Sequence, residues 1–195
     1  MRWLLLSATV VAAAALAGCG KPGPSGRGAQ APAEIGDASE RGKKAADALM
    51  ARLKSQLQAA MQSGGPVEAV SVCQNIALPL TEAEREAQGV AGIRRTTLKP
   101  RNPANAPDAM DRSVLEAMAA AANPGSEVRA DAGGSTRYYQ PIFVQEVCLK
   151  CHGDRATMPP ALTEKLTALY PSDQATGYAL GDFRGAIRVD FAPEP

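Results

Sequence analysis

The 195-residue chain contains one histidine, so its side chains offer few nitrogen ligands for a metal. Aromatic residues are also scarce, at 4% of the sequence, and apart from Trp3 they all lie between Tyr138 and Phe191. The 21 basic residues nearly balance the 20 acidic residues, so no excess of positive charge favours nucleic-acid binding. No internal repeat is present, which gives no support to a solenoid or other repeat architecture.

No apolar run reaches the roughly 20 residues that a transmembrane helix needs. The longest runs from Trp3 to Leu16, follows one basic residue and has the form of a secretory signal. It ends in LAGC (16–19), which resembles a bacterial lipoprotein signal, where cleavage precedes a cysteine that then carries lipid. We predict a signal peptide over residues 1–18 and lipidation of Cys19. An ordinary signal peptide with an incidental cysteine is the alternative.

Residues 19–35 are predicted to form the lipidated end and a flexible tether. The stretch GKPGPSGRGAQAPA (20–33) is rich in Gly and Pro and has no large apolar residue to bury. Gly20 stands where Asp would favour retention in the inner membrane, so we expect the periplasmic side of the outer membrane. Residues 36–195 are enough for one domain with its own core, and this domain should carry the function.

The order of the predicted elements indicates an α+β fold. Apolar residues recur at helical spacing over 36–62 and again over 67–80, and SGGP (63–66) separates these two helices. Because helices come first and most strands then follow one another, an antiparallel sheet is favoured over a doubly wound parallel one. The predicted strands are 93–99, 127–132, 136–144 and 185–191, and the later helices are 109–122 and 163–169.

The stretch VCLKCHGD (147–154) contains the pattern C-x-x-C-H, which is typical of covalent haem attachment. In this chemistry two thiols add to the porphyrin vinyl groups, and the next histidine binds the iron. We therefore predict one haem c, held by Cys148 and Cys151, with His152 as an axial iron ligand.

Three alternatives to haem attachment are weaker. Structural zinc takes four ligands, usually in two pairs, and the sequence has no second Cys/His pair. A dithiol redox centre would be expected in a βαβ context, which the pattern lacks. A Cys148–Cys151 disulfide is compatible with an oxidising compartment.

Three stretches of the chain resemble a known family. They are RRTTLKPRNPANAPD (94–108), YYQPIFVQEVCLKCHG (138–153) and YPSDQATGYALGDFRGAIRV (170–189). They are similar to the single-haem c-type domain family with a PAS-like fold, a domain of unknown function that is also the extracytoplasmic part of some sensor kinases. The resemblance extends from about residue 40 to the end of the chain. It implies a PAS-like antiparallel sheet with the haem held against it.

Arg94, Arg95, Lys99 and Arg101 place four positive charges within eight residues, with no acidic residue among them. Because arginine suits carboxylates, we predict that at least one of the four binds a haem propionate. The alternative is a solvated edge strand, on which charged residues are common. The clustered aromatic residues are likewise compatible with ordinary cross-strand pairs or with a wall for a flat cofactor.

The sixth iron ligand is predicted to be Cys73. One of the four cysteines is assigned to lipid and two to haem, and a spare thiol is a liability outside the cytoplasm. The family resemblance also implies a ligand cysteine in VCQNIA (72–77). Met158 is the rival ligand, and a buried cysteine that acts as a small apolar residue is the alternative without ligation.

These features predict a membrane-tethered redox protein rather than an enzyme. Electron transfer with an unidentified periplasmic protein partner is the first hypothesis. A redox or gas sensor that reports to a partner is the second, and it comes mainly from the family resemblance. A small peroxidase is the third and weakest, since no free histidine remains to assist peroxide chemistry.

Overall fold

A computed structural model describes residues 32–130 and 133–193. The predicted signal peptide and Cys19 therefore lie outside the described residues. Helix α1 (Pro32–Gln88) begins within the predicted tether, three residues before its end at residue 35, and proline is well suited to the first position of a helix. No helix in the described part of the chain combines the length and the apolar character needed to cross a membrane.

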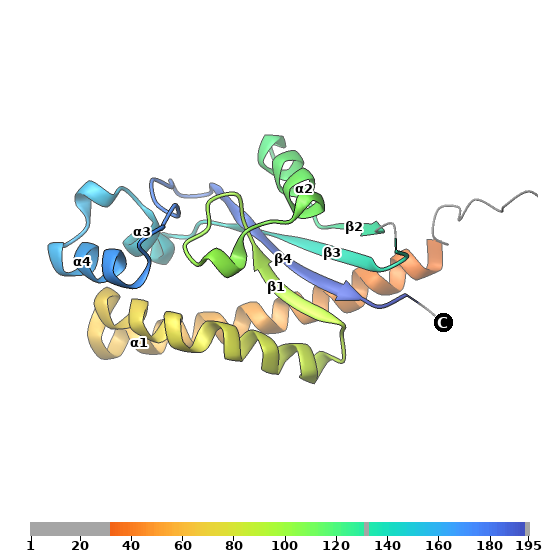
Figure 1. Cartoon of the computed structure of the whole chain (residues 1–195), viewed down its shortest axis with the longest axis horizontal. Coiled ribbons are helices and arrows are strands. Elements are labelled where there is room, and N and C mark those ends of the chain that lie inside the picture. The colour runs from red at the N-terminus through yellow and green to blue at the C-terminus, as the bar shows by residue number, and fades with distance from the viewer. Residues whose placement is uncertain (1–31, 131–132, 194–195) are drawn as a thin grey trace, which may run out of the picture.

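Four antiparallel strands form one sheet, and the predicted α+β class is confirmed. The strands are β1 (Gly92–Thr96), β2 (Glu127–Ala130), β3 (Thr136–Phe143) and β4 (Phe183–Phe191). Their order in the sheet is β1-β4-β3-β2, so the last strand in sequence lies between the first and the third (Figure 1). This insertion pairs Val189 with Ile93, 96 positions earlier, and with Tyr138, 51 positions earlier.

Helix α1 is a helical hairpin that covers one face of the sheet (Figure 1). The break predicted in SGGP is confirmed, since Gly65 has a φ of 68° and a ψ of −162°, outside the helical region. The first arm approaches the sheet closely at Gly42, where an added Cβ would lie 2.3 Å from the Tyr138 ring. The apolar core beneath it includes Leu49, Tyr138 and Ile187, all almost fully buried.

The opposite face of the sheet is covered by α2 (Ala109–Ala120), whose buried residues Leu115 and Met118 pack near Tyr139. Asp108 caps the helix by accepting a hydrogen bond from the Asp111 amide, and the Asp111 carboxylate accepts one from the Asp108 amide. The helix ends two residues earlier than predicted. Tyr138 and Tyr139 therefore point to opposite faces, as successive residues of a strand must.

The segment between β3 and β4 lies at one end of the sheet (Figure 1). It contains α3 (Glu146–His152), a short 3-10 helix (Arg155–Thr157) and α4 (Pro160–Leu169). Helix α3 was not predicted, because seven residues are too few to show helical periodicity. Buried Leu162 and Leu166 of α4 pack with Val70 of α1, which attaches this end of the molecule to the helical hairpin.

Candidate functional site

Helix α3 carries the three residues of the C-x-x-C-H pattern. Its helical turn places Cys148 and Cys151 three residues apart and therefore on neighbouring positions of one face. Both thiols are half-buried and neither forms a disulfide. The helix ends at His152, and Gly153 follows where an added Cβ would lie 2.7 Å from the Leu149 carbonyl oxygen. A side chain at position 153 would thus disturb the end of the helix that carries the histidine.

The imidazole of His152 is held in one orientation by the loop that follows α4. Its Nδ1 lies 2.7 Å from the carbonyl oxygen of Ala175, and only the N–H form of Nδ1 satisfies that acceptor. Burial, with the positive charges of Arg101 and Arg184, lowers the pKa of His152 to about 3, so the ring is neutral. A neutral ring with its hydrogen on Nδ1 leaves the Nε2 lone pair for a metal.

Cys73 comes to the same site from the second arm of α1. Burial raises the pKa of the Cys73 thiol, while Arg95 and Arg101 oppose the rise. Burial also raises the pKa of Cys151, and a charge on Cys73 would raise it further, so the two thiols lie within electrostatic range of each other. Residues 78 positions apart in sequence thus bring a third thiol to the region of the C-x-x-C-H helix.

Met158, the rival ligand, is also close to this helix. It is buried, with 9% of its surface exposed, and lies in the apolar cluster of Val70 and Leu162 against which Cys151 packs. Its side chain therefore packs in the apolar core at the α4 end of the molecule, next to the site. Both predicted sixth ligands are within this region.

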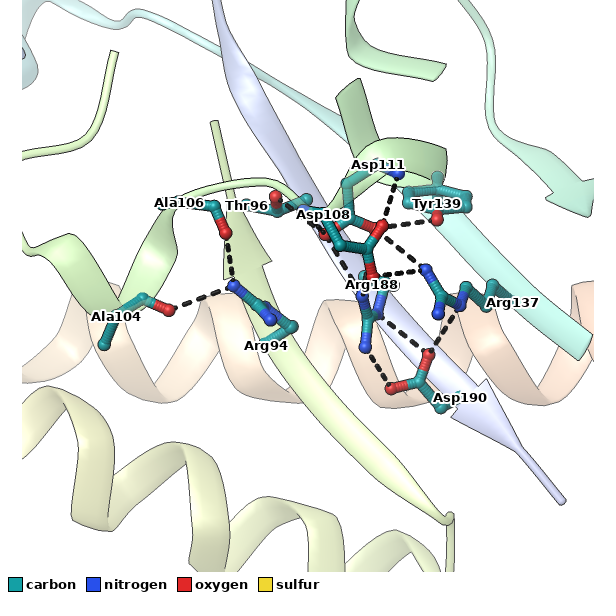
Figure 2. Close-up of polar contacts among 10 residues, drawn as sticks. All are labelled: Arg94, Thr96, Ala104, Ala106, Asp108, Asp111, Arg137, Tyr139, Arg188 and Asp190. Atoms are coloured by element: carbon teal, nitrogen blue, oxygen red, sulfur yellow. Dashed lines mark hydrogen bonds and ion pairs between the residues drawn. The ribbon is translucent and has the colours of Figure 1, made fainter. Parts of the chain in front are cut away.

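The structure divides the four predicted propionate-binding residues. Arg94 donates to the carbonyl oxygens of Ala104 and Ala106, at 3.0 and 2.7 Å, in the loop that follows β1 (Figure 2). Lys99 donates to the Thr176 carbonyl at 2.7 Å. Arg94 thus lies outside the site, whereas the other three residues border it.

Arg95 and Arg101 differ in what surrounds them. Arg101 forms an ion pair with Asp173, with 3.1 Å between its Nε and the carboxylate. Arg95 makes no ion pair with any residue in the described ranges. Burial lowers the pKa of the Arg95 guanidinium, and nearby Arg184 lowers it further.

Arg184 of β4 is a site residue that sequence reasoning missed. Its Nη1 donates to Thr97 Oγ1 at 2.8 Å, its guanidinium lies 5.3 Å from the Tyr178 ring centre, and its Nε is buried without a hydrogen-bond partner. Burial also lowers its pKa, and within the described ranges it too has no carboxylate partner. Arg184 is 83 positions from Arg101, so no local pattern connects it with the basic cluster. Two cations without counter-ions beside two thiols and a histidine form a site for an anionic group.

Known proteins show similarity to this chain in sequence and in structure. The model of the Tll0287-like family matches residues 29–192. The chain belongs to the Tll0287-like family. One similar solved structure is that of the cyanobacterial heme-protein Tll0287, with 26% sequence identity and a TM-score of 0.61. The match covers 85% of this chain and 98% of that protein. No protein with a curated description matches. Membership of the Tll0287-like family confirms the resemblance drawn from the three sequence stretches.

Proposed function

We propose that this chain binds one covalent haem through Cys148 and Cys151, with His152 as an axial ligand. The observation that carries the proposal is that the only histidine of the chain follows both thiols on one short helix and keeps Nε2 free for iron. The similar structure is of a heme-protein, which supports the same cofactor here. Haem would supply a one-electron couple between ferric and ferrous iron.

The charges of the site suit a porphyrin with two propionates. Arg95 and Arg184 would neutralise these carboxylates, which removes the cost of keeping two cations close together without counter-ions. Lys99 borders the same end of the site, with its ammonium group 4.4 Å from the Tyr178 ring centre. Tyr178 also contacts His152 edge to face, with ring centres 6.3 Å apart, and would limit access of water to the ligand.

Cys73 is the proposed sixth ligand because it reaches the site from α1, an element separate from the helix that carries His152, and its charge would act on Cys151. A thiolate favours ferric iron and a low reduction potential, whereas a methionine ligand raises the potential. The comparison of Cys73→Ala with Met158→Ala tests this assignment. The ferric absorption spectrum should change in the first variant and persist in the second; the reverse result would make Met158 the ligand.

The proposed role is electron transfer with a periplasmic protein partner. The protein would be anchored to the membrane through a lipid on Cys19, and its folded domain would have a PAS-like arrangement. A fixed ligand pair suits this role because little rearrangement accompanies a change of one electron. The second role is a redox or gas sensor. The presence of Cys73 and Met158 in one region favours it, since exchange of one sulfur ligand for the other would free a coordination position of the iron or change its ligand. Peroxidase activity has no observation in its favour.

The decisive experiment is expression of the full chain with the haem-attachment machinery, followed by denaturing electrophoresis and a haem stain. A stained band is expected for the wild type, and none for the Cys148→Ser/Cys151→Ser variant. A colourless wild-type band from cells that mature a control cytochrome would refute covalent attachment.

The two roles are separated by ligand binding. Carbon monoxide added to the ferrous protein should leave the spectrum unchanged if the protein only transfers electrons. A rapid spectral change would favour the sensor instead. Cys19→Ser tests the anchor, since the protein should then leave the membrane fraction.

A further inference from the structure

Arg101, one of the predicted propionate contacts, donates three hydrogen bonds beside the C-x-x-C-H helix. Its Nε donates to Asp173 Oδ2 at 3.1 Å, and its Nη2 donates to the carbonyl oxygens of Cys151 and of Ala175, the latter at 3.3 Å. Only 13% of the Arg101 side chain and 2% of the Asp173 side chain are exposed. Each of these acceptors belongs to a segment that touches the C-x-x-C-H helix.

The ion pair holds both backbone polar groups of Ala175. The Asp173 carboxylate accepts a hydrogen bond from the Ala175 amide at 2.8 Å, while Arg101 donates to the Ala175 carbonyl. That carbonyl is also the acceptor for Nδ1 of His152. The loop is tied further to the helix by hydrogen bonds from the Gly177 and Tyr178 amides to the Gly153 and His152 carbonyls, at 2.8 and 3.0 Å.

We propose that Arg101 and Asp173 are positioning residues that fix the Ala175 carbonyl and, through it, the orientation and donor strength of the His152 imidazole. A carbonyl shared with a guanidinium is a weaker acceptor for Nδ1–H, so the ring keeps its neutral character and donates less charge to a metal at Nε2. Removal of the guanidinium makes the carbonyl a stronger acceptor. Removal of the negative charge on Asp173 makes the Ala175 carbonyl a weaker acceptor, because the potential at its oxygen becomes less negative. This inference rests on the proposed haem ligation for its redox consequence, but not for the hydrogen bonds themselves.

The redox test compares Arg101→Gln, Asp173→Asn and Arg94→Gln in the full haem-loaded chain. Arg94 is the matched control, because it is also an arginine of the basic cluster that donates to two backbone carbonyls, but these lie in another loop. Spectroelectrochemistry should give a lower reduction potential for Arg101→Gln, a higher one for Asp173→Asn and an unchanged one for Arg94→Gln. Equal potentials in all four proteins, or shifts of the same sign in Arg101→Gln and Asp173→Asn, would overturn the proposal.

A second readout needs no haem. Because His152 is the only histidine, ¹⁵N-histidine labelling of the full chain without a histidine tag reports on this ring alone. The wild type, Arg94→Gln and Arg101→Gln should all show the tautomer with hydrogen on Nδ1. The Nδ1–H resonance of Arg94→Gln should match that of the wild type, whereas that of Arg101→Gln should move downfield, as a stronger hydrogen bond to the Ala175 carbonyl requires. An Arg101→Gln spectrum identical to that of the wild type would refute the positioning role.

Arg101→Lys separates position from charge, since lysine keeps the charge but cannot reach two carbonyls and the carboxylate with one planar group. We expect the Nδ1–H resonance to move downfield in this variant as well; a resonance at the wild-type position would show that the charge alone is sufficient and would refute the role of the planar guanidinium. If the chain failed to bind haem, the labelling experiment would still decide this inference, so the two failures are distinguishable.

Discussion

Two arginines four positions apart on β4 have opposite surroundings. Arg188 donates to Asp111 and Asp108 at 3.0 Å and contacts Asp190 at 2.9 Å, in an ionic network between the sheet and α2 (Figure 2). Arg184, at the α3 end of the same strand, has no carboxylate partner within the described residues. One strand thus contributes a neutralised cation to the fold and an uncompensated cation to the site.

The difference has an electrostatic consequence. Although burial alone would lower the pKa of Arg188, hydrogen bonds to Asp190 and Asp111 raise it, whereas burial lowers the pKa of Arg184. In the Arg188 network, ion pairs with Asp108, Asp111 and Asp190 join the sheet to α2 and stabilise the fold. A buried cation without a partner opposes folding, so its presence is accounted for by a ligand that brings the missing negative charge.

The largest effect on stability is expected at the centre of the network. Asp111 is fully buried and accepts hydrogen bonds from Tyr139, Thr96 and Arg188. Asp111→Ala should lower the free energy of unfolding by about 3–5 kcal/mol, because it removes the buried carboxylate to which Arg188, Tyr139 and Thr96 all donate. Chemical denaturation of the full chain measures the change.

The control for Asp111→Ala is Glu116→Ala on the same helix, whose exposed pair with Arg112 has a 3.9 Å separation. Its effect should stay within about 0.5 kcal/mol. Similar losses in both variants would show that the network contributes no more than an ordinary surface pair.

At the α3 end of β4, replacement of Arg184 should not lower the free energy of unfolding. Arg184→Leu and Arg95→Leu should leave the haem-free chain as stable as the wild type or more stable, because each removes a buried cation without a partner. In the haem-loaded chain the same variants should lower the reduction potential, since propionates without a counter-charge favour ferric iron. Denaturation before haem attachment and spectroelectrochemistry after it measure the two effects.

Arg94→Leu is the control for these variants, and its reduction potential should equal that of the wild type. A marked loss of stability in the haem-free Arg184→Leu chain would mean that Arg184 supports the fold as Arg188 does. The contrast between the two arginines would then be wrong.

The smallest effect concerns the acid sensitivity of the network. Burial alone would raise the pKa of Asp108, but hydrogen bonds from the Asp111 amide and Arg137 hold it below the ordinary value of 3.8. A lowered folded-state pKa contributes stability that is complete above about pH 4 and is lost as the pH falls through the folded value. Because the Asp108 side chain is 42% exposed, the contribution should be no more than about 1 kcal/mol.

Asp108→Asn keeps a helix-capping side chain and removes the charge. The wild type should be more stable than this variant at pH 7, and the difference should shrink toward zero at pH 3 in thermal unfolding. Asp37→Asn, which removes an exposed pair with Arg41, is the control. A difference that stays constant between the two pH values would contradict the linkage.

Much of the secondary structure was predictable because its signals are local. The glycine pair and proline at 63–66 break a helical pattern, and this break became the turn of the hairpin at Gly65. The predicted strand over 93–99 is shorter in the structure, since β1 ends at Thr96. The Thr97 amide instead donates to the Asn105 carbonyl of the next loop, a partner that no periodicity indicates.

The sequence by itself determined the C-x-x-C-H group, because residues within five positions on one helical turn are neighbours in almost any fold. It did not determine which charges surround this group. Insertion of β4 between β1 and β3 brought Arg184 to Arg95, and packing of the loop after α4 brought the Ala175 carbonyl to His152. Such partners are set by strand pairing and loop closure over tens of residues, and these depend on the packing of the whole chain rather than on any local pattern.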